Sequence, residues 1–312
     1  MEINVIQLIH SRSFLGFHCD HSSNRLGFFV LPHFESKTHL IRFSRFKLVN
    51  TLPYSLYSTV MAPRSVLITG ANRGIGLQFV RVYASMAGCD HVLATCRDQA
   101  AAKDLVAFAQ ASEGKVVILE LDVTQIESYP AFVKRVNEVV GDAGLNLLIN
   151  NAGYLPRNML WDQVTPEDMR RAFEVNCVAP VFLTKALLPL IQRAADAGKE
   201  ASVDVSRAGI VHISTAVASI AENSSGAKTG GFGYRCSKSA LNQAMKCMAI
   251  DLEDSGILVM CIHPGWVQTD MGGSNALLTA ETSAKTMVET LATLGPADHG
   301  AFRRYDNTTI PW

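Results

Sequence analysis

The chain has 312 residues, 48% of them hydrophobic, and it carries 28 basic and 28 acidic residues for a formal net charge of zero. This composition supports a sizeable core and predicts neither a nucleic-acid nor a membrane-surface partner, because both would favour a basic excess. No apolar run is expected to span a bilayer, and seven scattered cysteines without CxxC spacing predict reduced thiols in a cytoplasmic compartment.

Residues 1–62 differ in composition from the rest of the chain, and we interpret them as an N-terminal extension. They are rich in Ser, His, Phe and Arg and show no hydrophobic period of 2 or 3.6. An organelle transit peptide, a disordered extension and upstream sequence outside the working protein are all compatible with this pattern. We favour the last, because Met61 leads directly into the first convincing strand and the early acidic Glu2 is untypical of a transit peptide.

Residues 63–312 alternate short apolar runs with helical patterns. The expected strands cover residues 66–69, 91–95, 116–121, 145–149, 210–213 and 258–262, and the expected helices cover 75–87, 99–110, 131–140, 166–190 and 234–252. Residues 194–208 and 222–233 are small or polar and are expected to be surface loops. Apolar runs that do not alternate with polar residues indicate strands buried on both faces. We therefore predict one Rossmann-like α/β domain, a doubly wound parallel sheet of about seven strands with helices on both faces.

A glycine-rich turn at residues 69–76 (TGANRGIG) joins the first expected strand to the first expected helix. Glycines let a backbone turn sharply and approach a pyrophosphate, and a helix N-terminus offers free N–H donors. The alternative is a tight turn that only packs helix against strand. The position directly after the first buried strand favours a dinucleotide site. The cofactor contacts predicted in this turn are Gly70, Asn72, Arg73, Gly74, Ile75 and Gly76.

The charge at the end of the second expected strand predicts which dinucleotide binds. An NAD site usually places a carboxylate there for the ribose 2′-hydroxyl. Here the strand runs into Arg97, whose guanidinium suits a 2′-phosphate, and Arg73 in the turn is a second cation within reach. The sequence therefore predicts NADP(H), the alternative being that Arg97 is a solvated surface residue.

Tyr234 and Lys238 open the expected helix at residues 234–252 and lie four positions apart, on one helix face. A free Tyr has a pKa of about 10. A nearby ammonium is expected to lower that pKa, so that the phenol passes a proton to a carbonyl oxygen as hydride arrives from a nicotinamide. The YxxxK spacing alone is common in surface helices. Its position behind a nucleotide-binding turn favours the catalytic interpretation.

Taken together, the motifs of residues 61–312 resemble the short-chain dehydrogenase/reductase family. The matching segments are TGANRGIG, the pair at 122–123, NNAG at 150–153, Asn176, the YxxxK pair, and PGWVQT at 264–269. The resemblance implies that cofactor contacts include Asp122, Val123, Asn151, Ala152, Gly153, Tyr234, Lys238, Pro264, Gly265, Val267 and Thr269. It also implies that Asn176 holds a water in a proton relay to Lys238.

One position departs from the family pattern. The family's catalytic Ser follows the fifth strand as the second Ser of an ISS run, and here the run is Ile213-Ser214-Thr215. Thr215 falls on the catalytic position and carries an equivalent hydroxyl, although its branched Cβ narrows the space around it. The alternatives are that Ser214 serves instead, or that activity is impaired.

The resemblance is closer to the sniffer-like carbonyl reductases, on the segments at 145–153, 234–242, 263–273 and 305–312. It implies NADPH-dependent reduction of an aldehyde, ketone or quinone, with a small-molecule carbonyl as substrate and a homodimer as the assembly. An NADP(H)-binding sensor with weak turnover is the alternative function. His212 and His263 flank expected strands, but no second ligand has metal spacing, so we expect no metal site.

Overall fold

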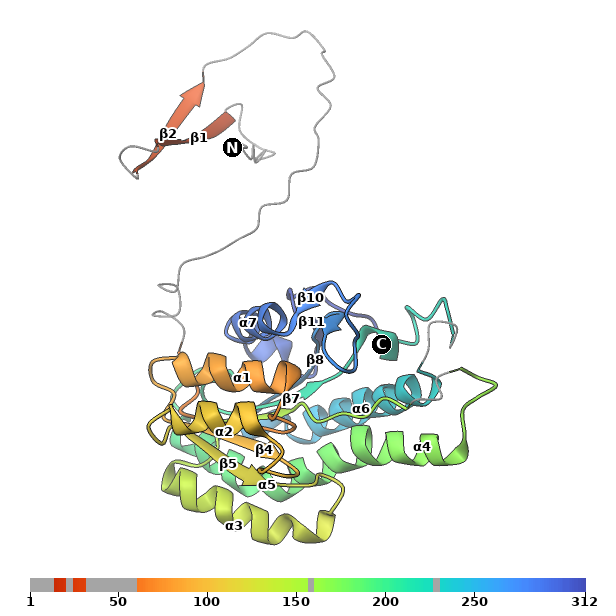
Figure 1. Ribbon diagram of the computed structural model, residues 1–312. Coiled ribbons are helices and arrows are strands. Elements are labelled where there is room, and N and C mark those ends of the chain that lie inside the picture. Colours follow the sequence, from red (N-terminus) through yellow and green to blue (C-terminus); the bar gives the residue numbers. More distant parts are fainter. Residues whose placement is uncertain (1–13, 21–24, 32–60, 157–159, 227–230) are drawn as a thin grey trace. The chain divides into compact units, whose positions relative to one another are not determined.

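Seven parallel strands form one sheet in the computed structural model, in the order β11-β8-β7-β6-β3-β4-β5 (Figure 1). The structure describes residues 14–20, 25–31, 61–156, 160–226 and 231–312. The strands of this sheet are β3 (Ser65–Ile68), β4 (His91–Cys96), β5 (Val116–Glu120), β6 (Leu147–Asn150), β7 (Gly209–Ile213), β8 (Leu258–His263) and β11 (Phe302–Arg304). The predicted Rossmann-like fold with a sheet of about seven strands is confirmed.

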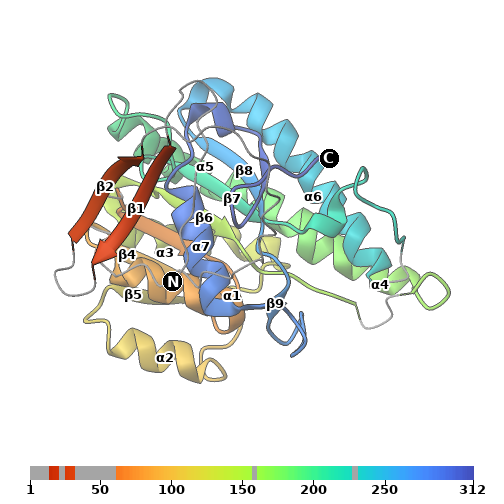
Figure 2. The same cartoon turned by 90° about the horizontal axis from the view of Figure 1, so that it is seen from above.

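Helices cover both faces of the sheet (Figure 1). One face carries α1 (Gly74–Ser85), α2 (Lys103–Gln110) and α7 (Ala280–Leu291), of which α1 and α7 pack side by side (Figure 2). The other face carries α3 (Tyr129–Val140), α5 (Ala179–Ala197) and α6 (Phe232–Asp251), and α4 (Pro166–Phe173) packs against α6. Neighbouring residues of β3 illustrate the double burial, because Val66 packs into one layer and Leu67 into the other.

The remaining short elements lie mostly at the edges of these layers. β9 (Val267–Gln268) pairs in parallel with β10 (Leu278–Thr279) after the end of β8. Single 3₁₀ turns occupy Ile126–Ser128, Gly141–Ala143, Ala216–Ala218, Glu253–Ser255 and Pro296–Asp298.

The N-terminal segment contains an antiparallel hairpin of β1 (Phe14–Asp20) and β2 (Arg25–Leu31), which the hydrophobic pattern does not predict. It belongs to a unit of residues 1–54 that is separate from the unit of residues 55–312. Most of residues 1–62 lies outside the described residues, so their interpretation as an extension outside the working protein stays a prediction.

The helix predicted over residues 166–190 is in fact three elements. α4 is followed by a π-helical turn, Glu174–Val178, and then by α5, which extends to Ala197 and shortens the loop predicted from residue 194. Pro180 directly follows the π-helical turn, and its missing N–H removes one backbone hydrogen bond from the continuous helical stretch. The sequence analysis also misses α7 and β11, because α7 is rich in Thr and Ser and β11 has only three residues.

By length and composition alone, one helical stretch among the described residues, Pro166–Ala197, is apolar enough to cross a membrane. The expectation that no apolar run is long enough to span a bilayer is therefore wrong on length and composition. In the structure this stretch buries Leu183, Leu187 and Ile191 in the layer beneath the sheet. Its place as a core helix accounts for its apolar composition.

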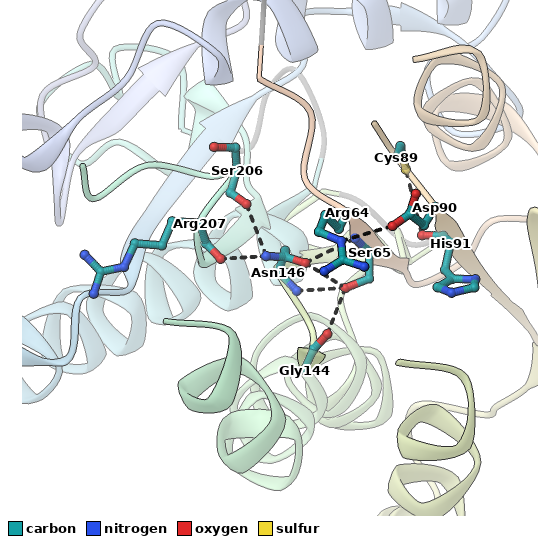
Figure 3. Close-up of polar contacts among 9 residues, drawn as sticks. All are labelled: Arg64, Ser65, Cys89, Asp90, His91, Gly144, Asn146, Ser206 and Arg207. Atoms are coloured by element: carbon teal, nitrogen blue, oxygen red, sulfur yellow. Dashed lines mark hydrogen bonds and ion pairs between the residues drawn. The ribbon is translucent and has the colours of Figure 1, made fainter. Parts of the chain in front are cut away.

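A buried asparagine ties together the amino-terminal ends of β3, β6 and β7 (Figure 3). The side chain of Asn146 donates from Nδ2 to the carbonyls of Arg207 (2.8 Å) and Ser206 (3.2 Å), and its Oδ1 accepts the Ser65 N–H at 3.2 Å. The Asn146 N–H in turn donates to Ser65 Oγ at 3.0 Å. These bonds fix the relative positions of the amino-terminal ends of three strands.

We expect Asn146→Ala to lower the free energy of unfolding by roughly 2–4 kcal/mol, because it leaves several buried polar groups without partners. Urea unfolding measures the change. Asn137→Ala is the control, since it removes one half-buried hydrogen bond, from Arg193, and should cost about 1 kcal/mol. Equal effects of the two substitutions would contradict the role assigned to Asn146.

Candidate active site

The order of the strands reverses at β3, and this reversal creates the main crevice. From β3 the chain adds β4 and β5 on one side and then places β6, β7 and β8 on the other. In open α/β sheets, ligands bind outside the carboxyl ends of the strands at such a switch point. A crevice of about 900 Å³ opens there, lined by residues that follow β3, β4, β5, β6 and β7 and by α6.

The glycine-rich turn is fastened to the segment after β6. Thr69 Oγ1 accepts the backbone N–H groups of Asn151 (3.0 Å) and Ala152 (2.9 Å), and Asn151 Nδ2 donates to the Thr69 carbonyl at 2.8 Å. A Cβ at Gly76 would lie 2.7 Å from Asn151 Nδ2 and closer still to the Gly70 carbonyl, so only glycine fits. α1 begins inside this turn without a side-chain cap, which leaves its first N–H groups available to an anion.

Cations stand on two sides of the crevice. Arg97 follows β4 and lies close to Asp122; burial raises the pKa of that carboxyl, but hydrogen bonds from Thr124 and the charge of Arg97 outweigh burial and hold the pKa below its usual range. Arg73 in the glycine turn pairs with Asp270 at 2.8 Å, and both side chains are exposed. The crevice thus places guanidinium groups within reach of an anionic ligand, each with a carboxylate beside it.

Lys238 is buried, with 3% of its surface exposed, and its ammonium is held by a backbone carbonyl. Its Nζ donates to the carbonyl of Ile213, the last residue of β7, at 2.7 Å. A Cβ at Gly153 would lie 3.9 Å from the same Nζ, so the segment after β6 approaches it closely. Burial lowers the pKa of Lys238 to about 8.

Tyr234 lines the crevice one helical turn before Lys238. From the sequence, the nearby lysine is expected to lower the pKa of this phenol, and the structure differs. Burial raises the pKa of Tyr234 to about 12. The ammonium is directed to the Ile213 carbonyl, so the desolvation of the phenol dominates.

The two hydroxyls after β7 have different environments. Ser214 Oγ donates to Asn242 Oδ1 of α6 at 2.6 Å, and Ser214 is 1% exposed. Thr215 precedes the 3₁₀ turn Ala216–Ala218 and makes no side-chain capping bond. Among the described residues no hydrogen bond engages the Thr215 hydroxyl, and its oxygen is not sealed from solvent.

Asn176 lies in the π-helical turn and is completely buried. Its Oδ1 accepts the Tyr154 N–H at 2.7 Å, while its Nδ2 donates to the Tyr154 carbonyl at 2.8 Å and to Ser237 Oγ at 3.0 Å. The side chain therefore joins the segment after β6 to α6. Its role in a water relay stays a prediction.

Most of the predicted site residues meet in this one crevice. Those that line it are Gly70, Asn72, Arg73, Gly74, Ile75, Gly76, Arg97, Asp122, Val123, Asn151, Ala152, Gly153, Ser214, Tyr234, Lys238, Pro264 and Thr269. Four predicted residues are not among the lining residues: Asn176, Thr215, Gly265 and Val267. Val267 is buried in β9, and Gly265 packs against Leu278 and Tyr305 with a φ of +84°.

Two further residues contact predicted site residues and were not predicted from the sequence. Asn242 binds Ser214, and it was detectable because it lies four positions after Lys238 on the same helix face. Asp270 pairs with Arg73, and no sequence signal links these two residues, which are far apart in the chain.

No group of three or more His, Cys, Asp or Glu side chains among the described residues could hold a metal ion. His212 is buried, lies 3.3 Å through Nδ1 from Asn150 Nδ2, and has its pKa lowered by burial to about 3. Burial likewise lowers the pKa of His263 to about 4. Both imidazoles are therefore neutral at neutral pH.

Comparisons with known proteins agree with this geometry. A model of the short chain dehydrogenase family matches residues 64–277. The carbonyl reductase Sniffer of Drosophila melanogaster is 39% identical, with a TM-score of 0.77 over 80% of this chain and 100% of that chain. An NADPH-bound carbonyl reductase from chicken fatty liver is 38% identical, with a TM-score of 0.75 and the same coverage. The C-signal protein of Myxococcus xanthus is 36% identical over 168 residues, 54% of this chain and 93% of that protein.

The buried Lys238 predicts a specific pH dependence of stability. Its pKa is 10.5 when free and about 8 when folded, so between these values the unfolded state binds more protons and stability rises with pH. The Lys238→Met variant has no amine at this position and therefore lacks this contribution to the pH dependence of stability. We expect the unfolding free energy of the wild type to gain roughly 3 kcal/mol relative to Lys238→Met between about pH 8 and pH 10.5. Urea unfolding of both proteins at several pH values measures the difference, and a constant difference would contradict a buried ammonium.

Proposed function

Because the chain belongs to the short-chain dehydrogenase family, we propose that it reduces an aldehyde, ketone or quinone to the corresponding alcohol with NADPH as hydride donor. One observation carries the proposal: Tyr234 and Lys238 of α6 line the same crevice as the glycine-rich turn 69–76. A proton donor and a dinucleotide cradle therefore share one space. The carbonyl reductases of Drosophila and chicken named above support the same chemistry.

The residues of the crevice fit NADPH. The glycine cradle and the free N–H groups of α1 suit a pyrophosphate, and the guanidinium groups of Arg73 and Arg97 suit a 2′-phosphate. When bound, this cofactor supplies the hydride of the reaction.

Tyr234 donates the proton. Burial raises the pKa of its phenol to about 12, so the phenol is protonated at neutral pH. Reduction of a carbonyl requires a proton at oxygen as the carbon is reduced, and a protonated phenol provides it.

Lys238 and Thr215 assist this transfer. The Lys238 ammonium, fixed on the Ile213 carbonyl, stabilises the phenolate that proton donation leaves on Tyr234. The Thr215 hydroxyl is available to donate a hydrogen bond to the substrate carbonyl oxygen, where negative charge develops.

We propose in addition that the protein is a cytoplasmic homodimer. Val178 and Phe182 are exposed apolar side chains one helical turn apart near the start of α5, and Ile250 is exposed at the end of α6. A second copy of the chain would remove such surfaces from water. Free thiols at Cys89, Cys96, Cys177, Cys236, Cys247 and Cys261 support a reducing compartment.

We expect Tyr234→Phe to lower kcat by roughly 10²- to 10⁴-fold with little change in the Kd of NADPH, because only the proton donor is lost. NADPH absorbance followed with a panel of aldehydes, ketones and quinones measures turnover. Tyr154→Phe is the matched control, since it removes another hydroxyl from the same crevice. Tight NADPH binding by the wild type without turnover of any carbonyl would contradict the enzyme and favour the NADP(H) sensor.

Cofactor preference tests the role of Arg97. We expect Arg97→Asp to raise the KM of NADPH by roughly 10- to 100-fold, because a charge-assisted hydrogen bond is lost, and to leave the KM of NADH similar or lower. Arg64→Asp changes the net charge equally at an exposed site paired with Asp90, and it controls for long-range electrostatics. An unchanged NADPH KM in Arg97→Asp would show that the 2′-phosphate is bound elsewhere.

A further inference from the structure

We propose that Ser214 and Asn242 form a positioning pair that sets the place of the Thr215 hydroxyl relative to Tyr234. This inference rests on the proposed function and assigns to Ser214 a role other than contact with substrate. The inference rests on the short, buried hydrogen bond between Ser214 and Asn242. Ser214 directly precedes Thr215, and Asn242 belongs to α6, the helix that contains Tyr234 and Lys238.

Three residues of α6 act along one face of the helix. Tyr234, Lys238 and Asn242 are spaced four apart, so their side chains follow one another along the helix axis. Lys238 donates to the Ile213 carbonyl at 2.7 Å, and Asn242 accepts from Ser214 Oγ at 2.6 Å. Two consecutive residues at the end of β7 are thus fastened to two consecutive turns of the catalytic helix.

The third residue in this run is Thr215, whose side chain makes no hydrogen bond among the described residues and whose carbonyl accepts the Ala218 N–H at 2.9 Å. The backbone just before it is also held by β8, because the Ser214 N–H donates to the Ile262 carbonyl at 2.8 Å. Thr has few accessible χ1 rotamers. The direction of its hydroxyl therefore follows the backbone position that Ser214 and Ile213 fix.

The environment of Asn242 indicates that the Ser214–Asn242 pair does more than stabilise the fold. Asn242 is 3% exposed and Ser214 is 1% exposed. Asn242 Nδ2 is buried without a hydrogen-bond partner among the described residues. An unsatisfied buried amide nitrogen costs free energy, so packing alone would favour an apolar side chain at this position. An apolar side chain could not supply the Oδ1 that accepts the hydrogen bond from Ser214 Oγ.

The same kind of bond at the opposite end of the sheet provides a matched control. Ser65 Oγ lies 3.1 Å from Asn146 Oδ1, and both residues are buried (Figure 3). Ser65→Ala therefore removes the buried contacts of Ser65 Oγ with Asn146 and with the Gly144 carbonyl without touching the crevice, so it is at least as disruptive to the sheet as loss of the Ser214–Asn242 bond. It should lower stability and leave kcat unchanged.

The test compares Ser214→Ala, Asn242→Leu, Thr215→Ala and their pairwise combinations with the wild type, using kcat for a carbonyl substrate and the Kd of NADPH. Thr215→Ala should lower kcat by roughly 10²- to 10³-fold, as for loss of one donor to a developing oxyanion. Ser214→Ala and Asn242→Leu should each lower kcat roughly 10- to 100-fold through misplacement, and their combination should cost no more than either alone. The Kd of NADPH should stay unchanged in all of them.

The decisive measurement is the Thr215→Ala background. If Ser214 acts through Thr215, adding Ser214→Ala to Thr215→Ala should lower kcat no further. A purely structural role predicts losses that multiply, and this result would overturn the proposal. Full activity of Thr215→Ala together with a 10²- to 10³-fold loss in Ser214→Ala would also overturn it, because Ser214 would then contact the substrate itself.

A second readout separates this proposal from the proposed function. Hydrogen exchange of the backbone amides of Ala218 and Ser219, whose bonds run to Thr215 and Ala216, reports on the backbone around Thr215 without any turnover. We expect faster exchange there in Ser214→Ala but not in Ser65→Ala. Unchanged exchange in Ser214→Ala contradicts the positioning pair even if the wild type is active, whereas an inactive wild type with the expected exchange contradicts only the carbonyl reductase.

Discussion

The arrangement of the site depends on the buried ammonium group of Lys238, which donates a hydrogen bond to one backbone carbonyl. The bond from Lys238 to Ile213 joins the middle of α6 to the carboxyl end of β7. A buried charge is tolerated only when its hydrogen bonds are made, so neither partner can shift without a large loss of free energy. Because Tyr234 belongs to the same helix and Thr215 to the same strand end, this bond determines how far apart proton donor and hydroxyl lie.

The lowered pKa of Lys238 and the raised pKa of Tyr234 have the same cause, which is desolvation. Desolvation lowers the pKa of the ammonium and raises the pKa of the phenol, and both changes disfavour the charged form. A protein with an exposed Tyr–Lys pair would have neither shift. Desolvation therefore sets the protonation states of Tyr234 and Lys238, whereas Arg97 and Arg73 remain in solvent.

Sequence patterns predicted the sheet well because buried parallel strands are continuous apolar runs, and the glycine spacing of 70–76 has few structural alternatives. They also placed Tyr234, Lys238 and Ser214 in one crevice, because Ser214 follows a recognisable strand and the other two lie at the start of a recognisable helix. They could not predict the π-helical turn at 174–178, because one extra residue per turn leaves no compositional mark. They also gave the wrong direction for the pKa of Tyr234, because desolvation depends on packing that spacing does not encode.

The network of Ser65, Asn146 and the carbonyls of Ser206 and Arg207 lies at the amino-terminal ends of the strands, whereas the crevice opens at their carboxyl ends (Figure 3). No residue of this network lines the crevice, although Lys238 and Asn242 fasten the other end of β7 within the site. Natural variation or protein engineering at the Asn146 network can therefore alter heat resistance without replacing a residue that lines the crevice.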